Sequence, residues 1–375
     1  MRCWVNMSTV HCALSLPNLP RMNALRRFWV LTLSLSCLQA WGQTEQGVGP
    51  SIAWDVSTDP RNAAIGGLDA APLSGDGWTV AVNPTALDST VERQLYTSYL
   101  DYFAGIRGGA VTLPLRHRGR LSTHAGIRFM NYGRFDETTA AGDLVGRFSG
   151  GDYAIQGGAS WSLDSLWTIG VTGFTGLRNL EKFNAAVLGM DVGVVRRSPD
   201  GLRALGLLVS NLGFQTDFSG IMPDGRLPHN VQIGWTQSFP DAPFTFHLRF
   251  QRLEMWDLAP EGTYDDAVDP LTGELIPNGT WIWGDQFFRH MCAGVTLNLG
   301  PQLRGHVGYN HQRQKTMAAA GRTGLSGMSL GIQGTFKTMR FSLARSVYHL
   351  AGGSTHLGLV LQLPKSPANR APAPP

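Results

Sequence analysis

Serine and histidine side chains near the C-terminus have a spacing that could support hydrolytic chemistry. Ser354 stands two residues before His356, and His349 precedes both. A serine beside a histidine supplies the nucleophile and base of many hydrolases, with an acid or amide to orient the histidine. No nucleophile-elbow or other ordered motif surrounds this pair. We therefore expect structural histidines, no catalytic residue, and a protein that is not an enzyme.

Acidic side chains gather in the segment 256–285, where carboxylates could collect Ca²⁺. The four are Asp265, Asp266, Asp269 and Glu274. Their spacing differs from that of an EF-hand loop, and no Cys/His group has the spacing of a zinc site. The segment "GRTGLSG" (321–327) lacks the Gly-Lys-Ser/Thr end of a phosphate-binding loop. We expect a solvated loop, with no metal site and no cofactor.

The elements that would position these residues are strands with a period of two. In "FTFHLRFQRL" (244–253), large apolar residues alternate with Thr245, His247, Arg249 and Gln251. Successive side chains of a strand point to opposite faces, so one face is apolar and the other polar or cationic. About fourteen segments share this pattern: 94–102, 105–115, 120–131, 150–163, 165–177, 184–197, 202–212, 229–239, 244–254, 286–299, 302–312, 326–336, 338–348 and 354–363.

The length of these segments favours strands that cross a membrane. Most are longer than the roughly five or six residues of strands in globular sheets, and a tilted strand needs about 9–11 residues to cross a bilayer. Tight turns alternate with longer polar stretches, as in outer-membrane barrels. A secreted soluble β protein would also show alternation. Strand length, the even count and inward Arg and His favour an all-β fold: a single transmembrane antiparallel β-barrel of about 14 strands.

In such a barrel the apolar faces contact lipid and the polar faces line a lumen, because only a closed barrel lets extended backbone cross hydrocarbon with its amides paired. The lumen-lining candidates are Arg120, His124, Arg128, His247, Arg249, Gln251, Arg304 and His306. The arginines either receive an anionic ligand or pair with acids of the lumen. Pairing is the commoner use, because an isolated charge in a narrow interior is costly.

The N-terminal residues 1–42 have the layout of a secretory signal peptide. Arg26 and Arg27 precede a short apolar run, and Ala40 and Gly42 provide small residues before the expected cut. Met22 opens this pattern and is the alternative start. The chain is therefore expected to be exported, to the outer membrane of a Gram-negative cell.

Three further parts follow the leader. Residues 43–92 are too rich in small residues for a barrel wall and are expected to enter the lumen, with Asn83 and Pro84 as candidates for a mobile hatch. Residues 93–363 are expected to form the barrel. The proline-rich segment 364–375 is expected to be disordered.

Charge and cysteine content exclude two further features. The leader contains four arginines and no acid, which leaves residues 43–375 with 27 basic and 27 acidic residues. This balance gives no basic patch, so we expect no nucleic-acid partner. Cys292 is the only cysteine after the leader, so no internal disulfide is expected.

Beyond alternation, the order of several segments resembles the PorQ family of the type IX secretion system. These proteins are relatives of PorV among the FadL-like outer-membrane barrels of the Bacteroidetes lineage. The similarity runs from about Asp59 to Leu363. The segments are "RNAAIGGLDAA", "AVNPTAL", "YLDYFAGI", "NYGRFDET", "FSGGDYA", "LRFQRLEMWDL", "DPLTGE", "RHMCAGV", "GYNHQRQ" and "ARSVYHLAGGSTHLGL". Each segment alone is weak, and their order carries the resemblance. The proline-rich tail after Leu363 departs from the pattern of a chain that ends on its last strand.

The resemblance implies a fourteen-stranded FadL-like barrel with an N-terminal segment in the lumen. It also implies a non-enzymatic component of type IX secretion that anchors a surface β-propeller protein similar to PorZ. A PorU-like sortase and a PorV-like barrel would join them in an attachment complex. The candidate residues of the partner loop are Trp256, Asp257, Tyr264, Asp265, Asp266, Asp269, Trp281 and Trp283. The alternative is a FadL-like channel for small hydrophobic molecules, against which the polar inner faces argue.

Overall fold

The structure is a computed structural model that describes residues 56–220, 225–260, 262–268, 275–317, 324–349 and 352–364. All of them belong to one of two compact units, Gln46–Pro375. The expected signal peptide and all but the first residue of the expected disordered tail lie outside the described residues.

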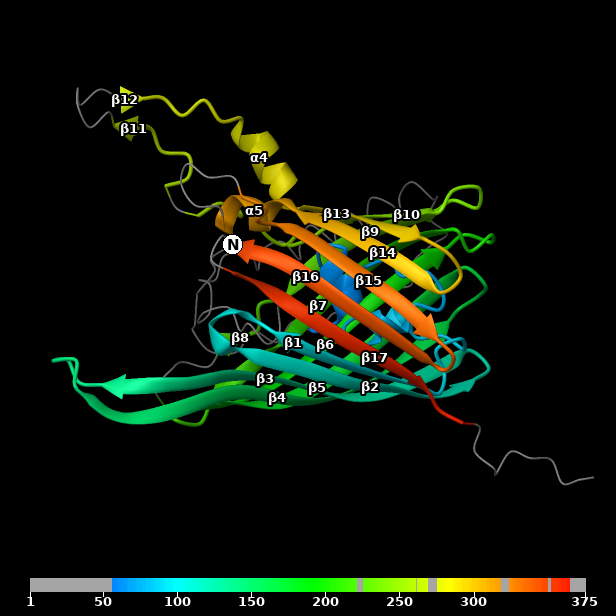
Figure 1. Ribbon diagram of the computed structural model, residues 1–375, viewed down its shortest axis with the longest axis horizontal. Helices are drawn as coiled ribbons and strands as arrows, with labels where there is room; N and C mark the ends of the chain where they lie inside the picture. Colours follow the sequence, from blue (N-terminus) through cyan, green and yellow to red (C-terminus); the bar gives the residue numbers. More distant parts are fainter. Residues whose placement is uncertain are drawn as a thin grey trace, which may run out of the picture. The chain divides into compact units, whose positions relative to one another are not determined.

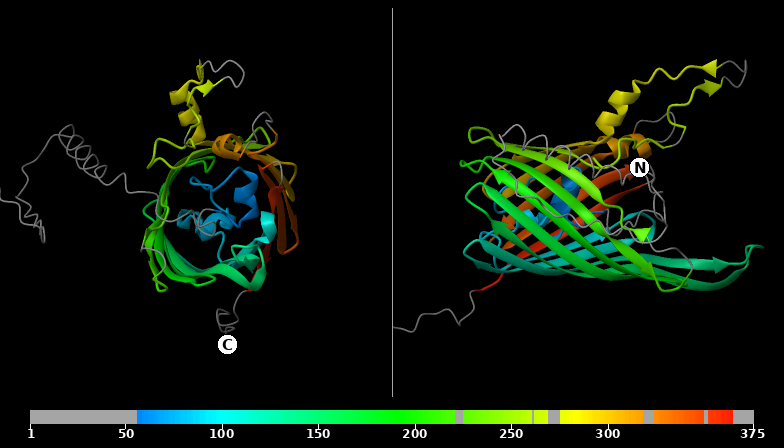
Figure 2. Two further views of the ribbon diagram at one scale, coloured as in Figure 1. Left: turned by 90° about the vertical axis from the view of Figure 1, so that its left-hand side faces the viewer. Right: turned by 180° about the vertical axis from the view of Figure 1, so that it is seen from behind.

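Fourteen antiparallel strands close into one barrel, which confirms the expected fold class and strand number. They are β1 (Gln94–Asp101), β2 (Arg107–Arg118), β3 (Leu121–Thr138), β4 (Leu144–Ser162), β5 (Trp167–Leu180), β6 (Phe183–Arg197), β7 (Arg203–Asp217), β9 (Asn230–Ser238), β10 (Phe244–Phe250), β13 (Met291–Asn298), β14 (Leu303–Asn310), β15 (Met328–Phe336), β16 (Met339–His349) and β17 (Gly352–Gln362). Each strand pairs with the next along the chain, and β17 returns to pair with β1. Figure 2 shows the resulting ring end-on.

Three short strands lie outside this ring of fourteen. β8 (Gly225–Arg226) pairs with the end of β7. β11 (Ala267–Val268) and β12 (Leu275–Ile276) pair with each other and form a separate two-stranded ribbon in the loop between β10 and β13.

Side-chain alternation sets the two faces of the wall, as β10 illustrates. Thr245, His247 and Arg249 are buried on the inner face. Phe244 and Phe246 are 39% and 41% exposed on the outer face. A wall one strand thick that exposes such apolar residues around its circumference is the lipid-facing surface of a membrane barrel.

The two ends of the barrel differ in the length of their connections. At the short-turn end, six turns of two to five residues join the strands, from the turn 119–120 between β2 and β3 to the turn 337–338 between β15 and β16. At the long-loop end, the β3–β4 hairpin extends beyond the wall, and the chain between β10 and β13 leaves the barrel. Figure 1 shows both features on its left-hand side.

Helices at the long-loop end correct two of the predicted strand boundaries. The segment predicted as a strand over 286–299 begins inside helix α4 (Ile282–Arg289), and the segment 302–312 ends in helix α5 (His311–Met317). Short apolar runs do not distinguish a strand from one or two helical turns, so alternation alone extends both predicted strands into residues that form helices. Among the described residues, no helix is long and apolar enough to cross a membrane.

The lipid-facing assignment predicts a position-dependent cost for a charge on the outer face. Val171, in the middle of β5, is 48% exposed. Val171→Arg is expected to cost about 2–4 kcal/mol of folding free energy in lipid, as arginine does at a bilayer midplane. Leu144, 58% exposed on the part of β4 beyond the wall, is the matched control. Leu144→Arg should cost under about 1 kcal/mol. Urea titrations in lipid vesicles measure both, and equal losses would contradict the assignment.

Candidate functional site

Residues 56–92 fold inside the barrel and are called the plug from here on; Figure 2 shows this segment in blue within the ring. Its helical turns are α3 (Pro60–Ala64), η2 (Gly77–Ala81) and η3 (Pro84–Ala86). The Asp59 carboxylate caps α3 by accepting a hydrogen bond from the Arg61 N–H at 2.8 Å. Gly66 and Gly67, with φ of +90° and +147°, turn the chain after α3 in a way that other residues rarely adopt.

The two expected hatch residues belong to this plug, and both are buried. Asn83 Nδ2 donates to the Asp69 carbonyl at 2.9 Å, and Asn83 Oδ1 accepts from the Thr85 N–H at 3.1 Å, which caps η3. Pro84 lies directly against Gly170 of β5. These contacts hold both residues against the rest of the plug and the wall, and movement as a hatch stays a prediction.

Glycines on the inner face of the wall make room for the plug. A Cβ atom added at any of them would crowd or overlap plug atoms. These glycines, on eight different strands, are Gly170, Gly193, Gly206, Gly234, Gly294, Gly308, Gly331 and Gly358. Six of them form three pairs across neighbouring strands, such as Gly206 opposite Gly234. Backbone atoms of the plug are met at five of these glycines, and plug side chains are met at Gly193, Gly331 and Gly358. In the sequence, the sign of this close packing is the presence of glycines at inward positions of the period-two segments.

Side chains of the wall satisfy backbone carbonyls of the plug. Arg197 Nη2 donates to the Thr85 carbonyl at 2.8 Å, and Arg197 Nε donates to the Pro72 carbonyl at 3.0 Å. Arg249 donates to the Leu68 carbonyl. Buried carbonyls need such partners. Arg249 is expected to bind an anionic ligand or to pair with an acid, but its hydrogen bonds go to carbonyls of the plug and to the Gln251 side chain.

An ionic cluster lies within the plug. Arg61 Nη1 is 2.9 Å from Asp69 Oδ2 and 2.5 Å from Asp76 Oδ2, and the three side chains are 10%, 4% and 11% exposed. His247 of β10 brings its Nδ1 to 3.7 Å from Asp69 Oδ2. One guanidinium thus holds two buried carboxylates, and loss of that partner would leave both uncompensated.

Protonation of one plug carboxyl changes near neutral pH. Burial, helped by the charge of Asp76, raises the pKa of Asp59 to about 7. Burial also raises the pKa of Asp76. For Asp69, burial acts in the same direction, but the nearby Arg61 prevails and lowers the pKa. A raised carboxyl pKa stabilises the folded state fully below the ordinary value of 3.8, and this stabilisation is lost as the pH rises through the folded value. The plug should therefore be held most firmly in mildly acidic solution.

Asp59→Asn should flatten this pH dependence, because asparagine keeps the capping oxygen and cannot ionise. Between about pH 4 and 7, protease cleavage within residues 56–92 of the wild type should become several-fold faster. Cleavage of the variant should change less, with each rate normalised to an unfolded substrate at the same pH. Parallel curves for the two proteins would rule out a role for Asp59.

The histidines predicted to line the lumen are buried on the inner face. His247 Nε2 and His306 Nδ1 both contact the hydroxyl of Thr296, at 3.1 and 2.9 Å. His124 Nε2 contacts the hydroxyl of Thr172 at 3.0 Å. These rings take part in cross-strand hydrogen bonds of the wall.

The other residues predicted to line the lumen differ from one another in burial and in their place along the strands. Arg128 is buried, with its guanidinium 5.0 Å from the centre of the Phe174 ring. Gln251 lies beyond the end of β10 and is partly buried, and Arg304 is exposed near the short-turn end of β14. The prediction for Arg120 is wrong. It is exposed in the β2–β3 turn, because β3 begins one residue later than predicted.

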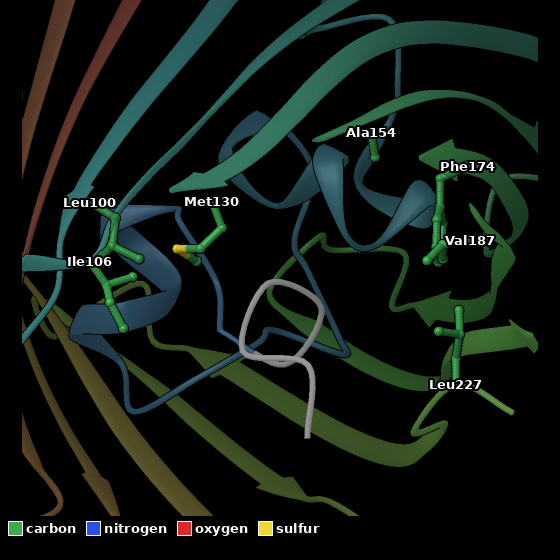
Figure 3. Close-up of a cluster of buried hydrophobic side chains, with 7 residues drawn as sticks. All are labelled: Leu100, Ile106, Met130, Ala154, Phe174, Val187 and Leu227. Atoms are coloured by element: carbon green, nitrogen blue, oxygen red, sulfur yellow. The ribbon is translucent and has the colours of Figure 1, made fainter. Parts of the chain in front are cut away.

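An apolar layer lines the inner face toward the long-loop end. Its buried members are Leu100, Ile106, Met130, Ala154, Phe174, Val187 and Leu227. Figure 3 shows Leu100, Ile106 and Met130 close together and Phe174, Val187 and Leu227 in a second group. The expectation of a polar inner face therefore fails in this part of the lumen, where inward positions of β1 and β3 to β6 carry apolar side chains.

The partner loop predicted from the sequence carries a group of exposed aromatic rings. Trp283 lies 5.9 Å from Trp256 and 5.7 Å from Trp281 between ring centroids. Their exposed fractions are 56%, 51% and 69%, and Ile282 beside them is 51% exposed. We call these four residues the aromatic platform. Figure 1 shows α4, which carries two of them, at the long-loop end above β13. Exposed apolar groups gathered in this way mark interaction surfaces.

Polar contacts fix the helix that carries the aromatic platform. Asp285 is 2.7 Å from Arg289 Nε and accepts a hydrogen bond from the Tyr264 hydroxyl at 2.9 Å. Gln286 donates to Asp257. Tyr264 and Asp257, two residues of the predicted partner loop, thus act on α4. Asp265 and Asp266 are exposed, and Asp269 lies outside the described residues.

The Ser/His pair is present, but its surroundings do not suit hydrolysis. Ser354 Oγ lies 2.8 Å from His356 Nε2, and both residues are 0% exposed. The side chain of His349 lies outside the described part of the chain. A pair without access to substrate is a packing feature of β17. Within the described ranges, no three His, Cys, Asp or Glu side chains are placed to hold a metal ion.

Comparison with known proteins finds solved structures with the same barrel fold. No protein-family model matches the chain, and no curated protein sequence matches it. The chain is similar to the CymD monoaromatic hydrocarbon channel, at 13% identity and a TM-score of 0.51, over 84% of this chain and 99% of that one. It is also similar to the Pseudomonas putida toluene transporter TodX, at 12% identity and a TM-score of 0.50, over 82% of this chain and 97% of that one. A Pseudomonas aeruginosa FadL homologue has 12% identity and a TM-score of 0.47, over 83% of this chain and 99% of that one. At this identity the likeness establishes the fold alone.

Proposed function

We propose that this chain is a non-enzymatic β-barrel of the outer membrane that anchors a surface partner of the type IX secretion system. The resemblance to the PorQ family suggests this role. The long-loop end faces outward and the short-turn end faces the periplasm, as in other bacterial barrels. The partner is a β-propeller protein similar to PorZ, in a complex with a PorU-like sortase and a PorV-like barrel.

The packing of the plug is the observation that carries the scaffold proposal. Eight wall glycines lie directly against the plug, and a buried arginine holds two of its carboxylates. Expulsion of the plug would break the glycine contacts with the wall and would expose the ionic cluster within the plug to water. A plug seated this firmly favours a role at the surface of the barrel over passage through its lumen.

The aromatic platform is the surface that we assign to the partner. Tryptophan is enriched among residues that dominate binding energy, where it fills pockets of the other protein. Three exposed tryptophans on a fixed helix and its loop match that composition.

An affinity pull-down from gently solubilised outer membranes tests the proposal. The tag is placed in residues 364–375, which follow the short-turn end and leave the platform free. The wild type should recover the β-propeller protein and the sortase. The double variant Trp281→Ser/Trp283→Ser should lower that recovery at least tenfold. The control is Trp161→Ser/Trp167→Ser, which changes two outward tryptophans, 50% and 40% exposed, at the short-turn end. Recovery of a solitary wild-type barrel would reject the scaffold.

The second candidate is a channel for small hydrophobic molecules. The apolar layer in the lumen favours it, as does the fold shared with proteins described as a hydrocarbon channel and a toluene transporter. Uptake of radiolabelled toluene by intact cells that carry or lack the chain tests this reading. Faster uptake that is lost on Met130→Asp would support the channel, and equal uptake in both strains would exclude it.

A further inference from the structure

A hollow of about 400 Å³ lies at the long-loop end of the wall, over β3 to β6. This volume falls within the range of roughly 300–1,000 Å³ that is common for small-molecule sites. Its lining includes Asn131, Gly151, Tyr153, Asn179, Asn184 and Phe218.

The strand register places three asparagines of this hollow in one row. Asn131 lies opposite Gly151, Gly151 opposite Asn179, and Asn179 opposite Asn184. We call these four residues the amide row. Phe218 continues it, because its N–H donates to the Asn184 carbonyl at 2.8 Å. Directly opposite residues of antiparallel strands have side chains about 5 Å apart, so the glycine leaves a notch between Asn131 and Asn179.

Two aromatic rings line the hollow: Tyr153 over the notch at Gly151, and Phe218 beside Asn184. Tyr153 lies one row closer to the middle of the wall, opposite Phe129 and Leu177. Its ring leans toward the amide row: a Cβ at Gly151 would lie 3.2 Å from both its Cε2 and its hydroxyl. Tyr153 is 52% exposed and Phe218 is 68% exposed. Both rings are therefore available to a ligand.

The charge of the hollow is balanced, and amide groups are free to bind. Arg178 belongs to the lining, but its Nε and Nη2 lie 3.0 and 3.1 Å from the two carboxylate oxygens of Asp152. Asn179 Nδ2 donates to Asn184 Oδ1 at 2.8 Å. Among the described contacts, this leaves the Asn179 side-chain oxygen and the Asn184 amino group for a ligand, one as acceptor and one as donor.

We propose that this hollow binds a neutral sugar. The C–H face of a pyranose ring packs on an aromatic ring, and its hydroxyls both donate to and accept from amides, which are the two chemistries that the hollow offers. Tyrosines gather at membrane interfaces, so Tyr153 marks the level at which the hollow opens, beside the lipid headgroups. The sugar belongs either to a glycolipid of the membrane or to a soluble oligosaccharide. The side of the membrane follows from the orientation proposed above, whereas the binding itself does not depend on it.

Calorimetric titration of the full chain in detergent tests the site. The probes are a lipopolysaccharide with a neutral hexose core, the oligosaccharide released from it by mild acid, and sugar-free phosphatidylglycerol micelles. Sugar-bearing probes should bind, and Asn179→Leu and Tyr153→Ala should each weaken binding at least tenfold. Tyr153→Phe should retain most of it. The control Tyr99→Ala changes an outward tyrosine of β1, 40% exposed, and should have no effect. Added salt should have little effect on the part of the binding that the two variants remove, because the hexose that contacts these residues is neutral.

The probes distinguish the two sources of the sugar. Equal binding of both sugar-bearing probes would mean that a free oligosaccharide suffices, whereas binding of the lipid-linked form alone would identify a glycolipid site. Heat-modified gel mobility confirms that each variant is folded. Sugar binding that is absent, or that the two variants leave unchanged, would overturn the proposal, as would equal binding of the sugar-free micelles. A failed pull-down would bear on the surface partner and leave this site untouched.

Discussion

Gly308→Val is expected to drive the plug out of the lumen. The added side chain would overlap backbone atoms of Ala64, Ile65 and Gly66. Neither side can yield easily, because β14 is paired on both edges and the plug turns sharply at this point. Overpacking costs about 1–3 kcal/mol where side chains can shift. A collision between two backbones should exceed that range, so we expect a loss of at least about 3 kcal/mol for the seated plug.

Protease cleavage within residues 56–92, together with heat-modified gel mobility of the barrel, measures this effect. The variant should show rapid cleavage of the plug while the barrel stays folded. Gly334→Val is the matched control on β15, where the Cβ position has no heavy atom within 4 Å, and its plug should stay protected. Full protection in Gly308→Val would mean that the wall can move, and the packing argument for a scaffold would then lose its basis.

Arg61→Met is expected to release the plug by a different route. The substitution removes the guanidinium that lies within 3 Å of Asp69 and Asp76 and leaves both carboxylates buried. Breaking a buried ion pair from one side costs about 3–5 kcal/mol. The loss should be largest at neutral pH and should shrink as the solution is acidified, because protonation removes the uncompensated charges.

Conductance across planar bilayers reports this release. The wild type should stay closed, whereas Arg61→Met should show open pores at neutral pH that become rarer toward pH 4. Arg107→Met removes an arginine that is 66% exposed at the rim, 3.9 Å from Asp101, and should leave conductance unchanged. Open pores that persist equally at all pH values would show that the cluster does not hold the plug through charge.

Alternation along the chain was enough to predict the barrel, because the pattern that defines each strand is local. Alternation states the face of each residue without knowledge of any partner strand, and in β10 the structure has the same inward and outward residues. The ends of a strand do not follow from alternation where contacts with a neighbouring segment determine whether a residue is in a strand or in a helix. α4 forms where apolar residues pack on the rim and Asp285 meets Arg289 and Tyr264, and these contacts come from residues spread over the loop.

Which residues meet across the wall depends on the register of the strands and on closure of the ring. A shift of a strand by two residues keeps every side chain on its face, so alternation cannot fix the register that aligns Asn131, Gly151, Asn179 and Asn184. For the same reason the sequence could not show that inward glycines of eight strands lie against one segment of 37 residues, 56–92. Their position around the plug depends on closure of the ring, which joins β1 to β17 across almost the whole length of the barrel sequence. Contacts between residues so far apart in the sequence depend on the complete fold, and no local sequence pattern encodes them.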